Sequence, residues 1–477
     1  MKKLYQMTIF SVTLLCLPLA ASAQSMEDKI KSLEATVEQL QETLMKMRDE
    51  MEKSKEASAS KSGGVVRTDG ENITVSTTGG GIKMKSDNGN AFQFGGRLMW
   101  DYDNYDFDGP NIGDEGDSSE AQWRRLRFTT KGTVKKDWHY ELTINFREGE
   151  GGAANDSSDV NMAYIKYTGF KPVTMTLGHF KEPFSLERLA SSNSILTIER
   201  GMILDVVNEG HGQPENGGFM VSGAYPEMAN LNWALGIFDD DREDEDGDDN
   251  YAITGRVAVA PSLNFGNNSF MHLGAAFSNR ERDNDRYRVR TRYGISSIGR
   301  NHECPNCRTT LGDLPAGDDI MQWGLEGAFV TGPFSLQAEY VDLEVDGGTA
   351  FNPDGTVLER YNDLEADGYY IQGAWTITGE QRRYKTSGGF FDKVKPKGPY
   401  GAWELVARYE EIDVEYDGVR GTRADATDNE AEKMLLGLNW YPNNNLKFML
   451  NYIDAEGELP GQDVDADAIS FRAQYAF

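Results

Sequence analysis

The sequence predicts an all-β protein, a 16-stranded antiparallel transmembrane β-barrel preceded by a short N-terminal coiled-coil helix. Three observations lead to this fold class. The chain begins with a secretory signal peptide, apolar and polar residues alternate in many segments of about 9–12 residues, and the connections between these segments are alternately short and long.

The signal peptide occupies residues 1–23. Lys2 and Lys3 form its charged start, residues 9–19 its apolar stretch, and Ala21-Ser22-Ala23 its cleavage site. No later stretch has the ~18 consecutive apolar residues of a transmembrane helix. We therefore expect a periplasmic protein, a secreted protein or an outer-membrane barrel. With 77 acidic and 48 basic residues, the chain is not expected to bind nucleic acid.

Residues 24–52 predict a periplasmic coiled-coil helix. Apolar residues recur there at alternating spacings of three and four, which is the pattern of a heptad seam. The core residue types favour two strands, although a trimer is compatible with so short a span, and a single amphipathic helix lying on another surface is the alternative. Residues 53–64 predict a flexible linker. The seam consists of Ile30, Leu33, Val37, Leu40, Leu44, Met47 and Met51.

Residues 65–477 predict the barrel domain. In HYELTINFR (139–147), for example, Tyr140, Leu142, Ile144 and Phe146 face one way and polar residues face the other. Tryptophan and tyrosine recur near the segment ends, as the aromatic girdles of a membrane barrel require. The predicted strand centres lie near residues 97, 127, 142, 164, 176, 220, 235, 256, 274, 325, 339, 372, 408, 436, 450 and 471.

One stretch, RYRVRTRYG (286–294), has an arginine at every second position. We call Arg286, Arg288, Arg290 and Arg292 the arginine ladder. A membrane-spanning strand here would make the strand count odd, so we place the ladder in a long outer loop of about 279–319. A row of guanidinium groups offers successive multidentate donors to an anion that moves along it. The alternative is a solvated loop arm whose arginines pair with Glu281, Asp283 and Asp285.

Two further features lie in predicted outer loops. The acidic run at 239–249 lacks the spacing of a calcium loop and is expected to be a solvated loop. Cys304 and Cys307 are the only cysteines after the signal peptide, and in an oxidising compartment we expect them to form a disulfide. No metal site, cofactor or enzymatic activity is predicted, because the zinc-ligand count and the hydrolase motifs are lacking.

Several long stretches resemble the phosphate-selective porin O and P family of Gram-negative bacteria. They include AQWRRLRFTTKG (121–132), LGHFKEPFSLERLASSNSILTIERG (177–201) and WGLEGAFVTGPFSLQAEY (323–340), with further similarity at 253–261 and 368–409. The resemblance covers about 90–477. It implies a homotrimeric outer-membrane porin with 16 strands, loops folded into each pore, lumen arginines that attract phosphate, and neither enzymatic activity nor a cofactor.

Strand parity and the resemblance together give the candidate site residues. Parity directs Arg97, Arg125, Arg127, Lys131 and Arg408 toward the lumen. Segment 181–216 is similar to the constriction loop of the family, and its basic residues are Lys181, Arg188 and Arg200. For Arg188 and Arg200, pairing with Glu187 or Glu199 to hold the loop is an equal alternative.

We therefore predict passive diffusion of anions through a lumen lined by arginines and lysines, and the resemblance implies that the anion is phosphate or polyphosphate. The alternatives are a structural or adhesive surface barrel and a general non-selective porin. The expected location is the outer membrane of a Gram-negative bacterium, with the N-terminal helix in the periplasm. The expected partners are phosphate or other small anions, outer-membrane lipid and lipopolysaccharide, and two further copies of the chain.

Overall fold

The computed structural model describes residues 63–68, 71–77, 81–109, 116, 118–146, 158–209, 215–239, 250–264, 266, 268–282, 284–298, 308–352, 354–422 and 426–477. The predicted signal peptide, the coiled-coil helix, the linker up to residue 62, the acidic run from residue 240 and both loop cysteines lie outside these residues. Among the described helices, none is long and apolar enough to span a membrane.

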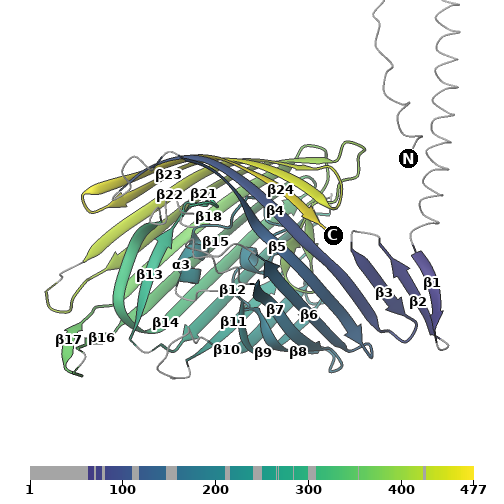
Figure 1. Cartoon of the computed structure of the whole chain (residues 1–477), viewed down its shortest axis with the longest axis horizontal. Helices are drawn as coiled ribbons and strands as arrows, with labels where there is room; N and C mark the ends of the chain where they lie inside the picture. Colours follow the sequence, from purple (N-terminus) through teal and green to yellow (C-terminus); the bar gives the residue numbers. More distant parts are fainter. Residues whose placement is uncertain are drawn as a thin grey trace, which may run out of the picture. The chain divides into compact units, whose positions relative to one another are not determined.

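Sixteen antiparallel strands of the described chain form a closed ring. The last strand of the ring pairs with the first, from Asp465↔Asp108 to Ala476↔Arg97, and Figure 1 shows these two strands side by side. Each predicted strand centre falls inside one strand of the ring, so the predicted barrel and strand count are confirmed. The strands are β4 (Ala91–Asp108), β5 (Ser118–Val134), β6 (Trp138–Phe146), β7 (Ser158–Tyr167), β8 (Val173–Lys181), β9 (Glu215–Tyr225), β10 (Leu231–Asp239), β11 (Tyr251–Val259), β12 (Phe270–Arg280), β14 (Thr309–Thr331), β15 (Phe334–Gly347), β18 (Leu364–Thr376), β21 (Ala402–Tyr416), β22 (Thr427–Tyr441), β23 (Leu446–Leu459) and β24 (Gln462–Ala476).

The outer face of the ring is apolar over its membrane-facing part. Leu325, Leu336 and Ile371 alternate with buried residues and are each more than two-fifths exposed. Trp403 stacks on Trp440 with ring centroids 5.3 Å apart, which builds part of an aromatic girdle. Side chains of the opposite parity therefore face the lumen.

Three short strands precede the barrel and were not among the predicted strand centres. They are β1 (Gly63–Thr68), β2 (Glu71–Ser76) and β3 (Ile82–Ser86), and β3 pairs with the start of β4. The turn between β3 and β4 has the sequence Asn88-Gly89, with Gly89 at φ 81°. Asn-Gly is a strong hairpin signal, so the sequence did contain a clue to this pairing.

The arginine ladder begins in an additional strand, β13 (Asp285–Thr291), which lies in the connection between β12 and β14. This strand pairs with the first half of β14, for example Tyr287↔Leu314, and is not part of the ring. The ladder lies in a connection between two strands of the ring, as predicted, but the connection is shorter than the predicted 279–319, because residues 309–319 belong to β14.

The remaining elements also lie in connections. The helices α2 (Leu186–Leu189) and α3 (Ile203–Glu209) belong to the connection between β8 and β9, and Figure 1 shows α3 among the barrel strands. Two hairpins are β16 (Thr349–Phe351) with β17 (Val357–Arg360) and β19 (Arg383–Lys385) with β20 (Phe390–Asp392).

The long strands, such as β15, β18 and β21, have an outer third next to the long connections, where the usual polarity of a porin wall is reversed. Apolar side chains face the lumen there, and carboxylates face outward. Lumen-facing Leu343, Leu364 and Val414 are buried and apolar, and they belong to one cluster with Tyr287 and Val289 of β13. The lumen is therefore filled on this side by apolar packing.

Outward-facing residues of the same strands are carboxylates, which we call the acidic belt. Many lie directly opposite one another across strand pairs, as in Asp367↔Asp413 and Glu432↔Glu456. The belt consists of Asp106, Asp108, Asp342, Glu344, Glu365, Asp367, Glu411, Asp413, Glu415, Asp428, Glu430, Glu432, Asp454, Glu456, Glu458, Asp463, Asp465 and Asp467.

Candidate functional site

The connection between β8 and β9 folds into the lumen, and we call its described residues, 182–209, the constriction loop. The loop turns at Ser185, whose side chain caps α2 by accepting a hydrogen bond from the Arg188 backbone nitrogen. Its segment 195–198 meets the far wall, where Lys447 Nζ donates to the Ile195 carbonyl oxygen at 2.7 Å and the Ile198 nitrogen donates to Asn451 Oδ1 at 2.8 Å. The loop therefore spans the lumen.

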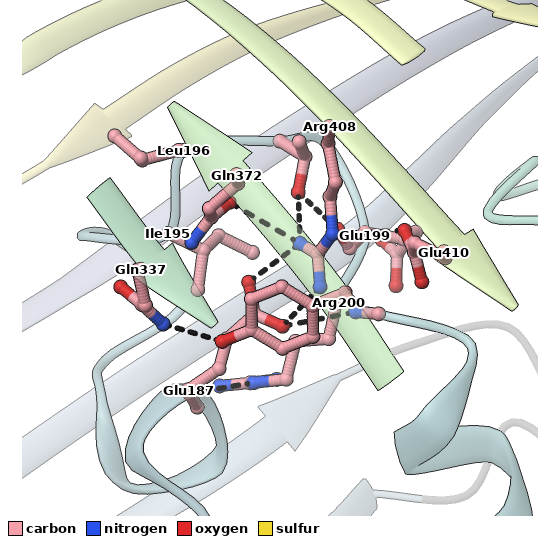
Figure 2. Close-up of polar contacts among 12 residues, drawn as sticks. Glu187, Ile195, Leu196, Glu199, Arg200, Gln337, Gln372, Arg408 and Glu410 are labelled. Carbon is pink, nitrogen blue, oxygen red and sulfur yellow. Dashed lines mark hydrogen bonds and ion pairs between the residues drawn. The ribbon is translucent and has the colours of Figure 1, made fainter. Parts of the chain in front are cut away.

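A first buried ion pair fixes the loop to β21. Arg408 donates to both carboxylate oxygens of Glu187 at 2.8 and 2.9 Å (Figure 2). The Arg408 guanidinium also lies 3.9 Å from the Tyr370 ring centroid. Burial alone would raise the pKa of Glu187, but the charge and hydrogen bonds of Arg408, together with a hydrogen bond from the Gly201 nitrogen, hold that pKa below its ordinary value. Glu187 is therefore a carboxylate anchor of the loop.

A second ion pair fixes the loop to β5 and β24. Glu199 accepts two hydrogen bonds from Arg124, at 2.9 and 2.8 Å, and a third from Arg472 at 2.8 Å. Burial would raise the pKa of Glu199, but Arg124, Arg125 and Arg472 together hold it well below its ordinary value. Arg472 is itself held by Asp101 at 2.6 Å.

A third ion pair lies at the start of the loop. Glu182 pairs with Arg280 of β12 at 2.5 Å and accepts a hydrogen bond from Thr254 Oγ1 at 2.6 Å. Burial would raise the pKa of Glu182, but the charges of Arg280 and Arg188 and the hydrogen bonds from Arg280 and Thr254 together lower it to about 2. The loop is thus tied at its start and at two internal carboxylates, so its path across the lumen is fixed.

Four cations converge between the loop and the wall of β4, β5 and β8, and we call Arg97, Arg127, Lys181 and Arg200 the cation cluster. Their charges repel one another, and Glu141 and Glu215 provide part of the compensation. All four side chains are partly exposed. Such a cluster is suited to an anion, because an anion relieves the repulsion.

Loop atoms orient the cations of the cluster. Arg97 donates to Ser192 Oγ at 2.7 Å, and Lys181 Nζ donates to the Arg188 carbonyl oxygen at 2.6 Å. Arg200 donates to the carbonyl oxygen of Ala190 at 3.0 Å. These acceptors are neutral, so they position the cations and leave their charge uncancelled.

The wall below the cluster carries Lys131, which is exposed and lies directly opposite Glu141 on β6. Glu141 also acts electrostatically on Arg97 and Lys166, and it accepts a hydrogen bond from the Tyr164 hydroxyl at 3.1 Å. Basic residues thus continue from the cluster toward the end of the barrel that holds the short turns, with one carboxylate among them.

The arginine ladder occupies one face of β13 and its continuation. Arg286 forms an ion pair with Asp313 of β14, and 57% of its side chain is exposed. The partners expected from the sequence were Glu281, Asp283 and Asp285, so Asp313 is a different carboxylate. Arg288, Arg290 and Arg292 are partly buried, and the residues between the ladder positions, Tyr287, Val289 and Thr291, are buried.

The predicted site residues are therefore not equivalent. The structure brings Arg97, Arg127, Lys181 and Arg200 together, while Lys131 and the ladder lie apart from them. Arg125 is buried beside Glu199, Arg188 is buried in the loop, and Arg408 is buried against Glu187. We expected Arg188 and Arg408 to line an open pore, but both are buried. Strand parity predicts which face of the wall a side chain lies on, but it does not predict which carboxylate the constriction loop brings to that face.

Two functional residues were missing from the prediction. Arg472 lies in SFRAQYAF, where its parity opposite Phe471 already points to the lumen. Arg124 could not be found by parity, because the register between β4 and β5 passes from Met99↔Arg125 to Trp100↔Trp123. This bulge at Arg124 turns two consecutive arginines toward Glu199.

Comparison with known proteins gives a consistent picture. The model of the family described as phosphate-selective porin O and P matches residues 92–477. Porin O of Pseudomonas aeruginosa is 35% identical over 437 residues, which cover 88% of this chain and 96% of that protein. An uncharacterized protein of Caulobacter vibrioides is 28% identical over 398 residues, 79% of this chain and 71% of its own length. Among solved structures, the chain is similar to a loop-deletion mutant of OmpT, an outer membrane protein of Vibrio cholerae, with a TM-score of 0.50 and 13% sequence identity. The match covers 81% of this chain and 99% of that one, and at this identity it shows similarity of the fold alone.

Proposed function

This chain belongs to the phosphate-selective porin O and P family, and on that premise we propose that its outer-membrane barrel conducts anions, phosphate foremost, past the cation cluster. The observation that carries the proposal is the convergence of Arg97, Arg127, Lys181 and Arg200 beside a fixed loop. Closely spaced guanidinium groups replace the water shell of a polyanion with paired, charge-assisted hydrogen bonds. Chloride, with one charge, gains less from them.

The path that we propose is off-centre. Lumen-facing Thr129, Lys131 and Glu141 on β5 and β6 are partly or fully exposed, whereas lumen-facing Gln337 and Leu343 on β15 are buried. Anions therefore pass along β4–β8, on the side where the lumen stays open to water. Weak successive sites favour exit as well as entry.

We extend the path outward along the arginine ladder. Arg286 is the most exposed of the four and pairs with Asp313. Arg288, Arg290 and Arg292 follow it on the same face of β13 and its continuation, and we propose that this face guides the anion. The experiment is the double variant Arg288→Ala with Arg290→Ala, which should weaken phosphate block of chloride current. Lysine at both positions should keep anion selectivity and lose the phosphate preference, because the planar fork is lost.

Assembly and location complete the proposal. We propose a homotrimer in outer-membrane lipid and lipopolysaccharide, with helices 24–52 associating in the periplasm. Crosslinking should give trimers, and deletion of residues 24–60 should leave a folded barrel. Crosslinking that yields only monomers while the helix is intact would contradict the proposed trimer.

We also propose that Cys304 and Cys307 are oxidised to a disulfide, which mass spectrometry of the unreduced peptide would show.

The function is tested by planar-bilayer recording with the full mature protein. Under a potassium chloride gradient the reversal potential should report anion selectivity, and added phosphate should reduce chloride current in a saturable manner. A cation-selective or unselective current without phosphate block would favour a general porin, and the absence of any conductance would favour a structural surface barrel.

A further inference from the structure

A cavity of about 290 Å³ lies between the lumen-facing wall of β7–β11, the tip of the turn at residues 387–390 and the constriction loop. Its walls are mixed. Met162, Phe180, Leu189, Met220 and Phe390 form an apolar part, and Thr174, Thr176, Ser222, Asn232 and Ser387 are among the polar lining residues. The volume is near the lower end of the ~300–1,000 Å³ range of small-ligand sites. The cavity therefore has room for one small organic molecule.

Three cations line the cavity, and one of them, Arg256, is paired with a carboxylate. Arg256 forms a bidentate pair with Glu326 at 2.8 and 2.6 Å, and Lys181 donates to two loop carbonyl oxygens. Lys166 is the third, with its ammonium 5.4 Å from the ring centroid of Tyr164. The lining residues include no carboxylate, so Lys166 and Lys181 give the cavity a preference for anions, while Glu141 acts on Lys166 from outside the lining.

We propose that this cavity is a subsite for an organic monoanion that combines one carboxylate with an aromatic ring, such as benzoate. Its carboxylate meets Lys166, and its ring packs against Met220 and Phe390. Phosphate fits less well, because part of its charged surface would lie against Met220 and Phe390, which an aromatic ring can cover. Acetate fits poorly because it has no ring to remove from water. The proposal goes beyond phosphate conduction and requires only that the lumen is open to solutes.

The first measurement is calorimetric titration of the detergent-solubilised full-length protein with benzoate and with acetate. Benzoate should bind in a saturable manner, with an affinity at least about tenfold higher than that of acetate. Lys166→Gln should weaken benzoate binding about tenfold. Lys171→Gln, in the exposed turn after β7, is the matched control and should bind as the unmodified protein does.

Two filling variants separate the cavity from general attraction to the lumen. Ala234→Phe and Ala224→Phe each place a ring in the cavity, and either should abolish benzoate binding while Lys166 is retained. If one of these variants misfolds, the other still tests whether filling the cavity prevents benzoate binding.

Equal binding of benzoate and acetate, or benzoate binding that is unchanged by Lys166→Gln and by a folded filling variant, would overturn the proposal. Bilayer selectivity measured on the same samples keeps the two claims distinct. Loss of benzoate binding with intact phosphate block removes only the subsite, whereas benzoate binding without anion selectivity removes only the phosphate function.

Discussion

Glu141 is a carboxylate within an otherwise basic path. It lies directly opposite Lys131, acts on Arg97 and Lys166, and is held by Tyr164. A fixed carboxylate beside these cations competes with a passing anion for the same donors. We infer that Glu141 keeps each anion site weak enough for release.

Replacing Glu141 with glutamine removes this competitor and retains the hydrogen bond from Tyr164. We predict that Glu141→Gln tightens phosphate binding about tenfold or less, because one exposed like-charge contact is worth ~1 kcal/mol. Phosphate block of chloride current is the measurement. Glu227→Gln, in the turn between β9 and β10, serves as control, and weaker block in Glu141→Gln would contradict the role.

At the scale of elements, the constriction loop is held by buried ion pairs and not by its own secondary structure. α2 has only four residues, and a helix this short is not stable alone. Arg408 with Glu187 and Arg472 with Glu199 therefore decide where the loop lies. The width of the pore follows from the geometry of these ion pairs.

Removing one partner of a buried ion pair costs up to about 3–5 kcal/mol. Without Glu187, Arg408 keeps a second carboxylate, Glu410 at 2.8 Å, so the cost of Glu187→Gln is expected to lie below this range. We predict that Glu187→Gln loosens the loop and increases open-channel noise and mean conductance. The double variant Glu187→Gln with Arg408→Gln should recover part of the stability, because no charge is left buried alone. Arg383→Gln, which breaks an exposed ion pair with Asp392, should behave as the unmodified protein.

Glu182 makes the attachment of the loop sensitive to acid. Its folded-state pKa of about 2 lies below the ordinary value of 4.5, so its stabilising contribution is complete above pH 4.5 and is lost as the pH falls through about 2. Between these values the thermal unfolding temperature should fall more steeply in the unmodified protein than in Glu182→Gln. Parallel slopes would show that Glu182 does not contribute.

At the scale of the whole molecule, the excess negative charge lies mainly where it does not oppose anion entry. The net charge of −29 is large, yet the acidic belt faces outward from the long strands, while the cation cluster lies inside the barrel. The belt also opposes folding, because directly opposed like charges such as Asp367 and Asp413 repel.

Salt should therefore stabilise the barrel. Raising the ionic strength from about 0.01 to about 1 M shortens the Debye length from ~30 to ~3 Å and screens the belt. We predict a higher unfolding temperature at high salt. Glu344→Gln with Glu365→Gln, which neutralises one opposed pair, should reduce this dependence, whereas an unfolding temperature that is independent of salt would contradict the account.

The strand count and the facing of most side chains could be predicted from the sequence, because alternation and connection length are local properties. The cation cluster could be predicted only in part. Arg97 and Arg127 follow from parity, but the burial of Arg408 depends on Glu187, which is 221 positions away in the chain. The apolar packing inside the outer third could not be foreseen either, since the strand parity that turns Leu343 inward does not reveal that β13 packs in the same cluster.

The central claim is that the cation cluster binds phosphate on its way through the barrel. The most direct measurement is phosphate block of chloride current in the double variant Arg97→Gln with Arg127→Gln, compared with Lys136→Gln in the exposed turn between β5 and β6. The account predicts that the double variant loses most of the block and part of its anion selectivity, while Lys136→Gln retains both. Unchanged phosphate block in the double variant would contradict it.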